Sequence, residues 1–408
     1  MDENRKSGVK RFTGDLLYGI VSLVTMNAVL SLGVYPYLQR QLGEAGQGRM
    51  LFFTALMGLT ASAAGSGINY GRMKMSTEHE THNGDYDRYL LVLALISCAV
   101  AVIGYAVRGQ GAQATLPGIF LLIFVTSVRY YADVEFRLTM NYRGFFFYYM
   151  LIAAGYAAGI FLYRFTKSWV GIFLCGEFAG LVYVCVKGSV FRHPFAAKSA
   201  FFRQDAKACT ELSAAYLMSD FVSYADRLCL SLIAGDVASD YFYIASLVGK
   251  MTSLLSTPLN GVITGHLAHY DRKITGKMFA KIFGVLSALA VGIALLAILG
   301  SHIFVWLFYR EQYEAVRGLF VLANTSQVFF FLANTMMVVV LRFAPAKTQM
   351  ILGAVYSALF FAAVLPLMWF FGLYGAAWGL LMINIFKYLL ISAMGFAALG
   401  KDPKTDGR

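Results

Sequence analysis

Long apolar runs recur along the chain and are separated by short polar segments. Each run is close to the roughly 20 residues that an α-helix needs to cross the hydrocarbon core of a bilayer. The pattern predicts an all-α polytopic membrane protein with about twelve spans. We expect an interfacial turn at 301–316, between the ninth and tenth spans. The predicted spans cover residues 13–38, 48–70, 89–107, 116–138, 144–163, 169–187, 211–234, 240–265, 277–300, 316–341, 348–371 and 374–398.

The composition supports membrane insertion and excludes several classes of protein. Apolar residues make up 59% of the chain and charged residues 14%, whereas a soluble protein carries about 25% charged residues. There is no GxxxxGK[ST] motif, so the chain is not by itself an ATP-driven pump. A glycan-polymerising membrane enzyme would carry a large soluble loop between spans, and no internal loop here is that long. We therefore expect a transporter that needs no cofactor or metal, rather than an enzyme.

The basic residues predict the orientation of the spans. The net charge is +12, and cytoplasmic loops of membrane proteins are rich in Lys and Arg. The loop at 187–207 holds five such residues, and most of the others fall in loops on the same predicted side. We interpret the first apolar run as an uncleaved span rather than a signal peptide, because it extends to Leu38. Both termini are then expected in the cytoplasm.

The same basic loop divides the chain into two halves. We expect a six-helix bundle at 1–190, a cytoplasmic basic linker at 191–210 and a second six-helix bundle at 211–408. A short echo supports a repeat, since "LGEAGQG" at 42–48 and "AGDVASD" at 234–240 share a small-Gly-acid pattern. Halves of six helices have the same orientation, as in transporters built from parallel repeats.

Four basic residues fall well inside predicted spans, away from the span ends, where charge is costly and commonly marks a pathway for cargo. They are Arg129, Arg227, Lys250 and Lys387. Arg binds phosphate through two parallel hydrogen bonds, and Lys acts as a point charge. We expect these four side chains to bind an anionic substrate, with Arg227 and Lys250 as possible neighbours on a helical hairpin.

Each of these cations could instead close an ion pair inside its own bundle. Arg129, Asp133 and Arg137 are spaced four residues apart, so they share one helical face and could form a ladder. Arg227 has no carboxylate one turn away on its own helix. Asp226 is adjacent in sequence but projects from a different face, and Asp220 lies two turns earlier.

Three acidic residues are candidates for proton or ion coupling, because a buried carboxylate can exchange protons with a pathway. They are Asp15, Glu177 and Asp220. A satisfied structural acid remains the alternative for each of them. His79 and His82 lie among acidic residues after the second span. A metal site is conceivable there, but we interpret the segment as a solvated polar loop.

Three stretches of the chain resemble bacterial polysaccharide flippases, which export O-antigen or capsule repeat units. These flippases belong to the multidrug/oligosaccharidyl-lipid/polysaccharide (MOP) exporter superfamily. The first stretch, at 32–75, contains "PYLQRQLGEAGQG" and "GINYGRMK", which are similar to the first two spans of that family. The second, "YADRLCLSLIAGDVASDYFYIASLVGKM" at 224–251, resembles the seventh span with its Asp-Arg pair. The third is "GLYGAAWGLL" at 372–381, near the last hairpin.

The resemblance implies a fold, a cargo and a mechanism. Two bundles would enclose a central cavity, lined largely by spans one, two, seven and eight, that opens alternately to either side. The implied cargo is an undecaprenyl-pyrophosphate-linked oligosaccharide, flipped across the bacterial plasma membrane. The implied partners are membrane lipids and the polymerase and glycosyltransferases of the same pathway, with no nucleic acid. A proton- or sodium-coupled exporter of drugs or small solutes on the same scaffold is the alternative, although mainly basic span residues favour an anionic cargo.

Overall fold

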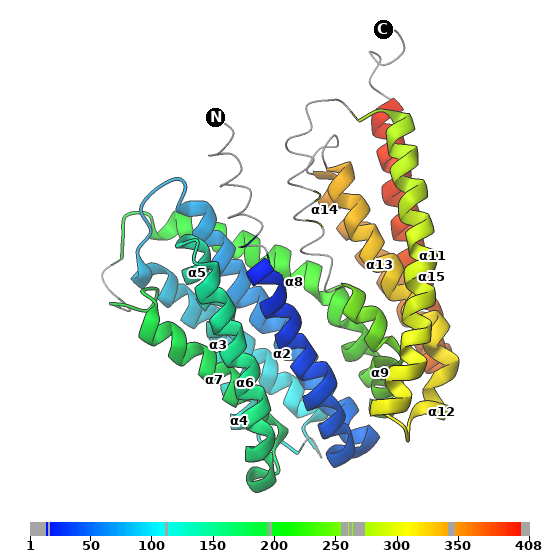
Figure 1. Cartoon of the computed structure of the whole chain (residues 1–408). Coiled ribbons are helices and arrows are strands. Elements are labelled where there is room, and N and C mark those ends of the chain that lie inside the picture. The colour runs from blue at the N-terminus through cyan, green and yellow to red at the C-terminus, as the bar shows by residue number, and fades with distance from the viewer. Residues whose placement is uncertain are drawn as a thin grey trace. The chain divides into compact units, whose positions relative to one another are not determined.

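The structure is a computed structural model that describes residues 14, 17–110, 113–193, 195, 198–253, 260, 263, 274–341 and 347–400. Two compact units make up the chain, Met1–Leu228 and Cys229–Arg408 (Figure 1). Every regular element in the described ranges is a helix, as the sequence predicts. The division lies inside a continuous helix, further along the chain than the linker expected at 191–210.

The first unit begins with a helical stretch from Leu17 to Met75 and ends within α8. Its described elements are the π-helix η1 (Val29–Val34), α2 (Tyr35–Met75), α3 (Asn83–Arg108), α4 (Leu116–Ala132), α5 (Val134–Leu138), α6 (Tyr142–Thr166), α7 (Trp169–Lys187) and α8 (Phe202–Ile233).

The second unit contains the rest of α8 and the C-terminal helices. The described elements are α9 (Asp236–Ser253), α11 (Gly276–Phe308), α12 (Tyr313–Val316), the 3-10 helix η2 (Arg317–Leu319), α13 (Phe320–Val340), α14 (Lys347–Leu359), the π-helix η3 (Phe360–Val364) and α15 (Leu365–Gly400). The turn predicted at 301–316 is shorter than expected. Helix α11 continues to Phe308, because Ser301 and Val305 belong to its buried face.

Seven helical stretches in the described residues are long and apolar enough to cross a membrane. Two of them, Leu17–Met75 and Ile351–Leu399, have 59 and 49 residues, far more than one crossing requires. Each is interrupted by a glycine with positive φ, Gly43 at 68° and Gly372 at 55°. Each long stretch therefore corresponds to two of the predicted spans. The shorter or more polar helices α4, α8 and α9 occupy the positions of three further predicted spans.

Large apolar side chains lie exposed on the long C-terminal helices. Leu296 and Ile303 on α11 are 71% and 70% exposed, and Trp369 and Phe370 on α15 are 72% and 76% exposed. Contiguous apolar surface of this kind is avoided in soluble monomers and marks contact with a membrane or a partner. With the long apolar helices, it identifies a multi-pass membrane protein.

The short sequence echo has a structural counterpart. Gly43 and Gly235 occupy equivalent positions in the two seven-residue segments, and both adopt positive φ, 68° and 95°. Residues with a side chain rarely adopt this backbone conformation, whereas glycine does so without a steric penalty. The echo therefore preserves a turn, in addition to a residue pattern.

Helix α8 packs closely along α2 within the first unit. A Cβ atom on Gly58 would lie 2.5 Å from the Tyr224 ring, and one on Gly71 would lie 2.6 Å from the Cys209 sulfur. Gly67 makes a similar approach to Ser213. The glycines at these positions of α2 permit the close packing. The predicted seventh span is consequently held by the first unit over much of its length, not by the second as expected.

Candidate functional site

Two of the predicted functional residues form a buried ion pair in the first unit. The Nε atom of Arg129 on α4 donates to the Oε2 atom of Glu177 on α7 at 2.7 Å. The hydroxyl group of Tyr156 on α6 donates to Oε1 of the same carboxylate at 2.6 Å. Arg129 is 4% exposed and Glu177 is fully buried. Arg129 also lies 4.0 Å from the ring centroid of Tyr130. The geometry suits an ionised carboxylate bound to a permanent cation.

Contacts to other helices replace the ladder expected for Arg129, Asp133 and Arg137. Asp133 accepts a hydrogen bond from the Tyr149 hydroxyl group on α6 at 2.9 Å. Arg137 donates to the Tyr70 hydroxyl group on α2 at 2.7 Å. Asp133 remains within the electrostatic influence of both arginines. Sharing one helical face brings these residues near one another, but tertiary packing supplies their hydrogen-bond partners.

Asp220 on α8 faces α2. Its Oδ2 atom accepts a hydrogen bond from the Ser62 hydroxyl group at 2.7 Å. Ser62 lies between Gly58 and Gly67 on α2, where α8 packs closely enough for this contact. Within the described part of the chain, Asp220 forms no ion pair, and its hydrogen-bond partner is a neutral donor.

Arg227 lies near the end of the first unit, one turn beyond Tyr224 on α8. Its guanidinium carbon is 5.2 Å from the Tyr224 ring centroid, a distance typical of a cation–π contact. Its Nε atom lies 3.9 Å from Oδ1 of Asp226, and its backbone N–H donates to the same oxygen at 2.8 Å. The sequence predicts that Asp226 projects away, but its carboxylate turns back toward the next residue. The arginine side chain keeps 15% of its surface exposed.

The two lysines belong to the second unit and lie against aromatic rings. The Lys250 Nζ atom on α9 is 5.9 Å from the Phe242 ring centroid and 5.7 Å from that of Tyr243. The Lys387 Nζ atom on α15 donates to Oδ1 of Asn334 at 2.9 Å. It also lies 4.5 Å from the Phe330 ring and 4.6 Å from the Tyr356 ring. Since Arg227 and Lys250 fall in different compact units, their proximity stays a prediction.

Asp15, the third candidate coupling acid, lies outside the described residues. The described residues contain no group of three or more His, Cys, Asp or Glu side chains that could hold a metal ion. His79 is not solvated as expected but lies against α8, where it pairs with Asp205 at 2.9 Å.

Several polar partners of the predicted site residues could not be identified from the sequence. Tyr156, Tyr130, Ser62 and Asn334 each contact one of the predicted residues. Hydroxyl and amide side chains are frequent within these spans, so their presence alone marks no site. Only the helix packing shows which of them faces a charge.

Comparison with known proteins relates the chain to transporters by structure alone. No protein-family model and no curated protein sequence matches it. An inward-facing multidrug resistance MATE family transporter of the MOP superfamily superposes with a TM-score of 0.63 and 14% identity, covering 94% of this chain and 99% of that one.

Two further structures show the same similarity. The Vibrio cholerae MATE transporter VcmN, in its bent form, matches with a TM-score of 0.57 and 15% identity over 97% of this chain and 98% of that one. A Pyrococcus furiosus transporter of the MOP superfamily, described as having a binding pocket of reverse polarity, gives a TM-score of 0.60 and 14% identity over 95% and 96%. All three neighbours are transporters rather than enzymes. The chain is a multi-pass membrane protein with the two-half fold of MOP superfamily transporters.

Proposed function

We propose that this protein is a flippase for an anionic lipid-linked oligosaccharide, which it moves across the membrane by alternating access around a cationic cavity. Lys387 carries the proposal. Its contacts in the structure are a neutral amide oxygen and two aromatic rings, and within the described residues it forms no ion pair. A cation held among neutral groups at membrane depth is costly unless function requires it. An anionic cargo supplies the missing charge.

The chemistry of the cargo fits the chemistry of these residues. A pyrophosphate linkage carries negative charge and a glycan carries many hydroxyl groups, so neither crosses hydrocarbon unaided without a large desolvation cost. Arg227 offers a forked donor for phosphate oxygens, and Lys250 and Lys387 offer point charges. Arg129 suits this role less well than the other three cations, because Glu177 already neutralises its charge.

Among the acids, Asp220 is the stronger coupling candidate. Glu177 is bound to a permanent cation and to the Tyr156 hydroxyl group, so protonating it would break an ion pair. Asp220 accepts from the neutral Ser62 hydroxyl group. It can take up and release a proton with no loss of an ion pair. Its position between α2 and α8 would link its charge state to the packing of these two helices.

The second candidate function is a proton- or sodium-coupled exporter of drugs or small solutes. Structural similarity to multidrug resistance MATE transporters favours it. A binding pocket for cationic drugs requires acidic residues, because opposite charges attract. The polarity of the cavity is therefore the property that separates the two functions.

One reconstitution experiment distinguishes them. Purified protein in liposomes is supplied with a fluorescent polyprenyl-pyrophosphate oligosaccharide, and translocation is measured as protection from a membrane-impermeant reductant. A cationic dye is offered in parallel. We expect movement of the glycolipid, lost in Lys387→Met and retained in the control Lys281→Met, which changes a loop-proximal lysine. Transport of the dye without the glycolipid would establish the exporter instead.

A further inference from the structure

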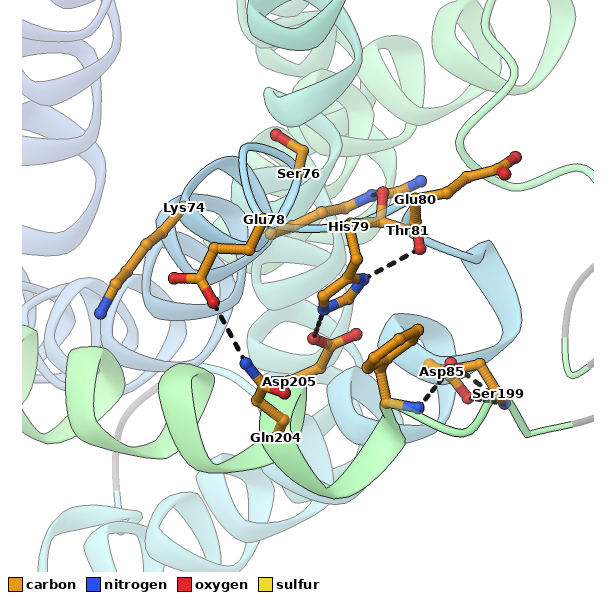
Figure 2. A network of polar contacts seen from close by, with 12 residues as sticks. Lys74, Ser76, Glu78, His79, Glu80, Thr81, Asp85, Ser199, Gln204 and Asp205 are labelled. Atoms are coloured by element: carbon orange, nitrogen blue, oxygen red, sulfur yellow. Dashed lines mark hydrogen bonds and ion pairs between the residues drawn. The ribbon is translucent and has the colours of Figure 1, made fainter.

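A set of polar contacts fastens the beginning of α8, and the segment that precedes it, to the loop between α2 and α3 and to the first turns of α3 (Figure 2). All of these residues belong to the first unit. At the centre, His79 from the loop meets Asp205 from the first turn of α8. We call the contacts between residues 78–89 and residues 189–210 the α8 latch.

His79 is held on three sides. Its Nε2 atom lies 2.9 Å from Oδ1 of Asp205, and its Nδ1 atom lies 3.0 Å from the backbone oxygen of Glu80. Its ring stacks on Phe201 at a centroid distance of 4.3 Å and an interplanar angle of 13°. An oxygen atom lies near each ring nitrogen, and this arrangement favours the imidazolium form, in which both nitrogens carry a proton.

Neighbouring contacts extend the latch along the chain. Gln204 donates from Nε2 to Oε2 of Glu78 at 3.1 Å. The backbone N–H of Ser199 donates to both carboxylate oxygens of Asp85, at 3.2 and 3.3 Å. The other contacts join Asn83 to the carbonyl oxygens of Ser189 and Arg192, Arg88 to that of Phe195, and Tyr89 to Thr210.

The charged groups around the His79–Asp205 pair favour the protonated ring. The hydrogen bond to the Glu80 carbonyl raises the pKa of His79 above its usual 6.5, against an opposing effect of desolvation, and Asp205 and Glu78 raise it further. On α3, Tyr86 lies within electrostatic reach of Asp205. The Arg72 guanidinium on α2 lies over the Tyr86 ring at 5.1 Å and donates to Tyr131 and Asn83.

Helix α8 connects the two compact units, so its contacts bear on any motion between them. The boundary between the two compact units falls inside this continuous helix, after Leu228. Motion of one unit relative to the other therefore acts on α8, and the contacts of α8 with α2 and the α2–α3 loop resist it. The glycine-lined contacts of α2 and the polar latch are the attachments that such a motion would release.

We propose that the α8 latch is a pH-sensitive gate element, closed by the His79–Asp205 ion pair and released during each transport cycle. The proposal rests on the alternating access of the proposed function, but it does not depend on the cargo. When His79 loses its proton, the ion pair is lost and the latch weakens. Proton concentration at this end of the protein then sets the fraction of molecules in which α8 is free to move.

Cys209 provides a native reporter of latch opening. It lies on α8 one turn beyond Asp205 and is 1% exposed, with its sulfur packed against Gly71. All five cysteines are free thiols. With Cys98, Cys175, Cys185 and Cys229 changed to Ser, the rate at which a membrane-permeant maleimide alkylates Cys209 measures the open fraction.

We expect Asp205→Asn to increase the alkylation rate by at least about two- to fivefold, the factor for loss of a solvent-exposed ion pair, because this pair keeps only 10% and 4% of its side-chain surface exposed. His82→Asn, in the same loop but at a residue outside the latch pair, is the matched control and should leave the rate unchanged. Between pH 6 and pH 8 the alkylation rate of Cys209 should rise more steeply in the parent than in His79→Asn. Thiol ionisation raises the rate in both proteins, so the comparison removes its contribution. His79→Arg keeps a permanent cation and should remove the excess pH dependence.

A second experiment tests whether release is part of transport. Gly71→Cys places a second sulfur next to Cys209, and oxidation would tie α2 to α8. We expect oxidation to stop translocation reversibly, with recovery on reduction. Unchanged alkylation in Asp205→Asn, or undiminished transport in the oxidised protein, would overturn the latch. The alkylation measurement uses no cargo, so its result is independent of whether the proposed glycolipid is correct.

Discussion

The Nε atom of Arg129 lies 2.7 Å from Oε2 of Glu177, although 48 residues separate the two in sequence. The sequence predicts a separate role in transport for each, the arginine on the cargo and the glutamate on a coupling ion. The pair is buried, and Tyr156 completes the hydrogen bonding of the carboxylate. This arrangement connects three helices, α4, α6 and α7, and indicates a structural role within the first unit.

Removing one member of this pair should destabilise the protein severely. In Glu177→Gln the buried guanidinium loses its counter-charge, and breaking a buried pair in this way typically costs about 3–5 kcal/mol. Thermal unfolding of purified protein in detergent should show the loss. The double variant Arg129→Met with Glu177→Leu, which leaves no charge behind, should regain most of it. If Glu177→Gln were as stable as the parent but inactive, the coupling role would return.

Arg227 is predicted to bind the pyrophosphate of the cargo. Arg227→Ala should abolish translocation at nearly normal protein level, and Arg227→Lys should retain part of it, because the charge stays but the forked donor is lost. The measurement is glycolipid translocation normalised to protein in the membrane. The nearby Asp226 offers the competing explanation of an ion pair. Rescue of Arg227→Ala by Asp226→Asn would contradict phosphate binding.

Substitution of Lys387 should abolish translocation without loss of thermal stability, whereas substitution of Glu177 should reduce thermal stability. Lys387→Met removes a cation whose partners in the structure are neutral, so we expect equal or greater thermal stability together with loss of translocation. Asn334→Leu, which deletes its hydrogen-bond acceptor, should reduce translocation less. A Lys387→Met protein that transports normally would remove the observation on which the proposed function depends.

The His79–Asp205 pair should make stability depend on pH. The folded pKa of His79 lies above its unfolded value of about 6.5, so protonation is linked to folding. The contribution of the pair is fully present below pH 6.5 and is lost as the pH rises through the folded pKa. The difference in unfolding temperature between the parent and His79→Asn should therefore be larger at about pH 5.5 than at about pH 8.5. A constant difference across this range would show that the ring contributes by packing alone.

The orientation of the chain remains a prediction from its basic loops. A cytoplasmic reporter fused after Arg408 should be active, and a reporter that works only outside the cytoplasm should be silent. The basic loop at 187–207 should likewise be accessible to impermeant reagents only in inverted membrane vesicles. Labelling of that loop from the outer side would contradict the predicted cytoplasmic location of the basic loop and of both termini.

The hydrophobic pattern by itself determined the class of fold. Apolar runs of membrane-crossing length specify helices, since only a helix satisfies its own backbone hydrogen bonds in lipid without neighbouring strands. The same pattern located most of the crossings, including the two that meet at Gly43 and the two that meet at Gly372. The unusual residues Arg129, Glu177, Asp220 and Lys387 were also recognisable, because charge in an apolar run is visible without any structure.

Tertiary structure alone decided which charges meet. From the sequence, Arg129 was a cargo-binding candidate with a ladder to Asp133 as the alternative, and Glu177 was treated as separate. Packing of α4 on α7 joined Arg129 to Glu177 across 48 residues. Packing of α8 on α2 is a second example, since it places the loop residue His79 beside Asp205. A local pattern gives the face of a helix on which a side chain lies, but the partner on that face depends on helix packing, and helix packing depends on contacts between residues distant in sequence.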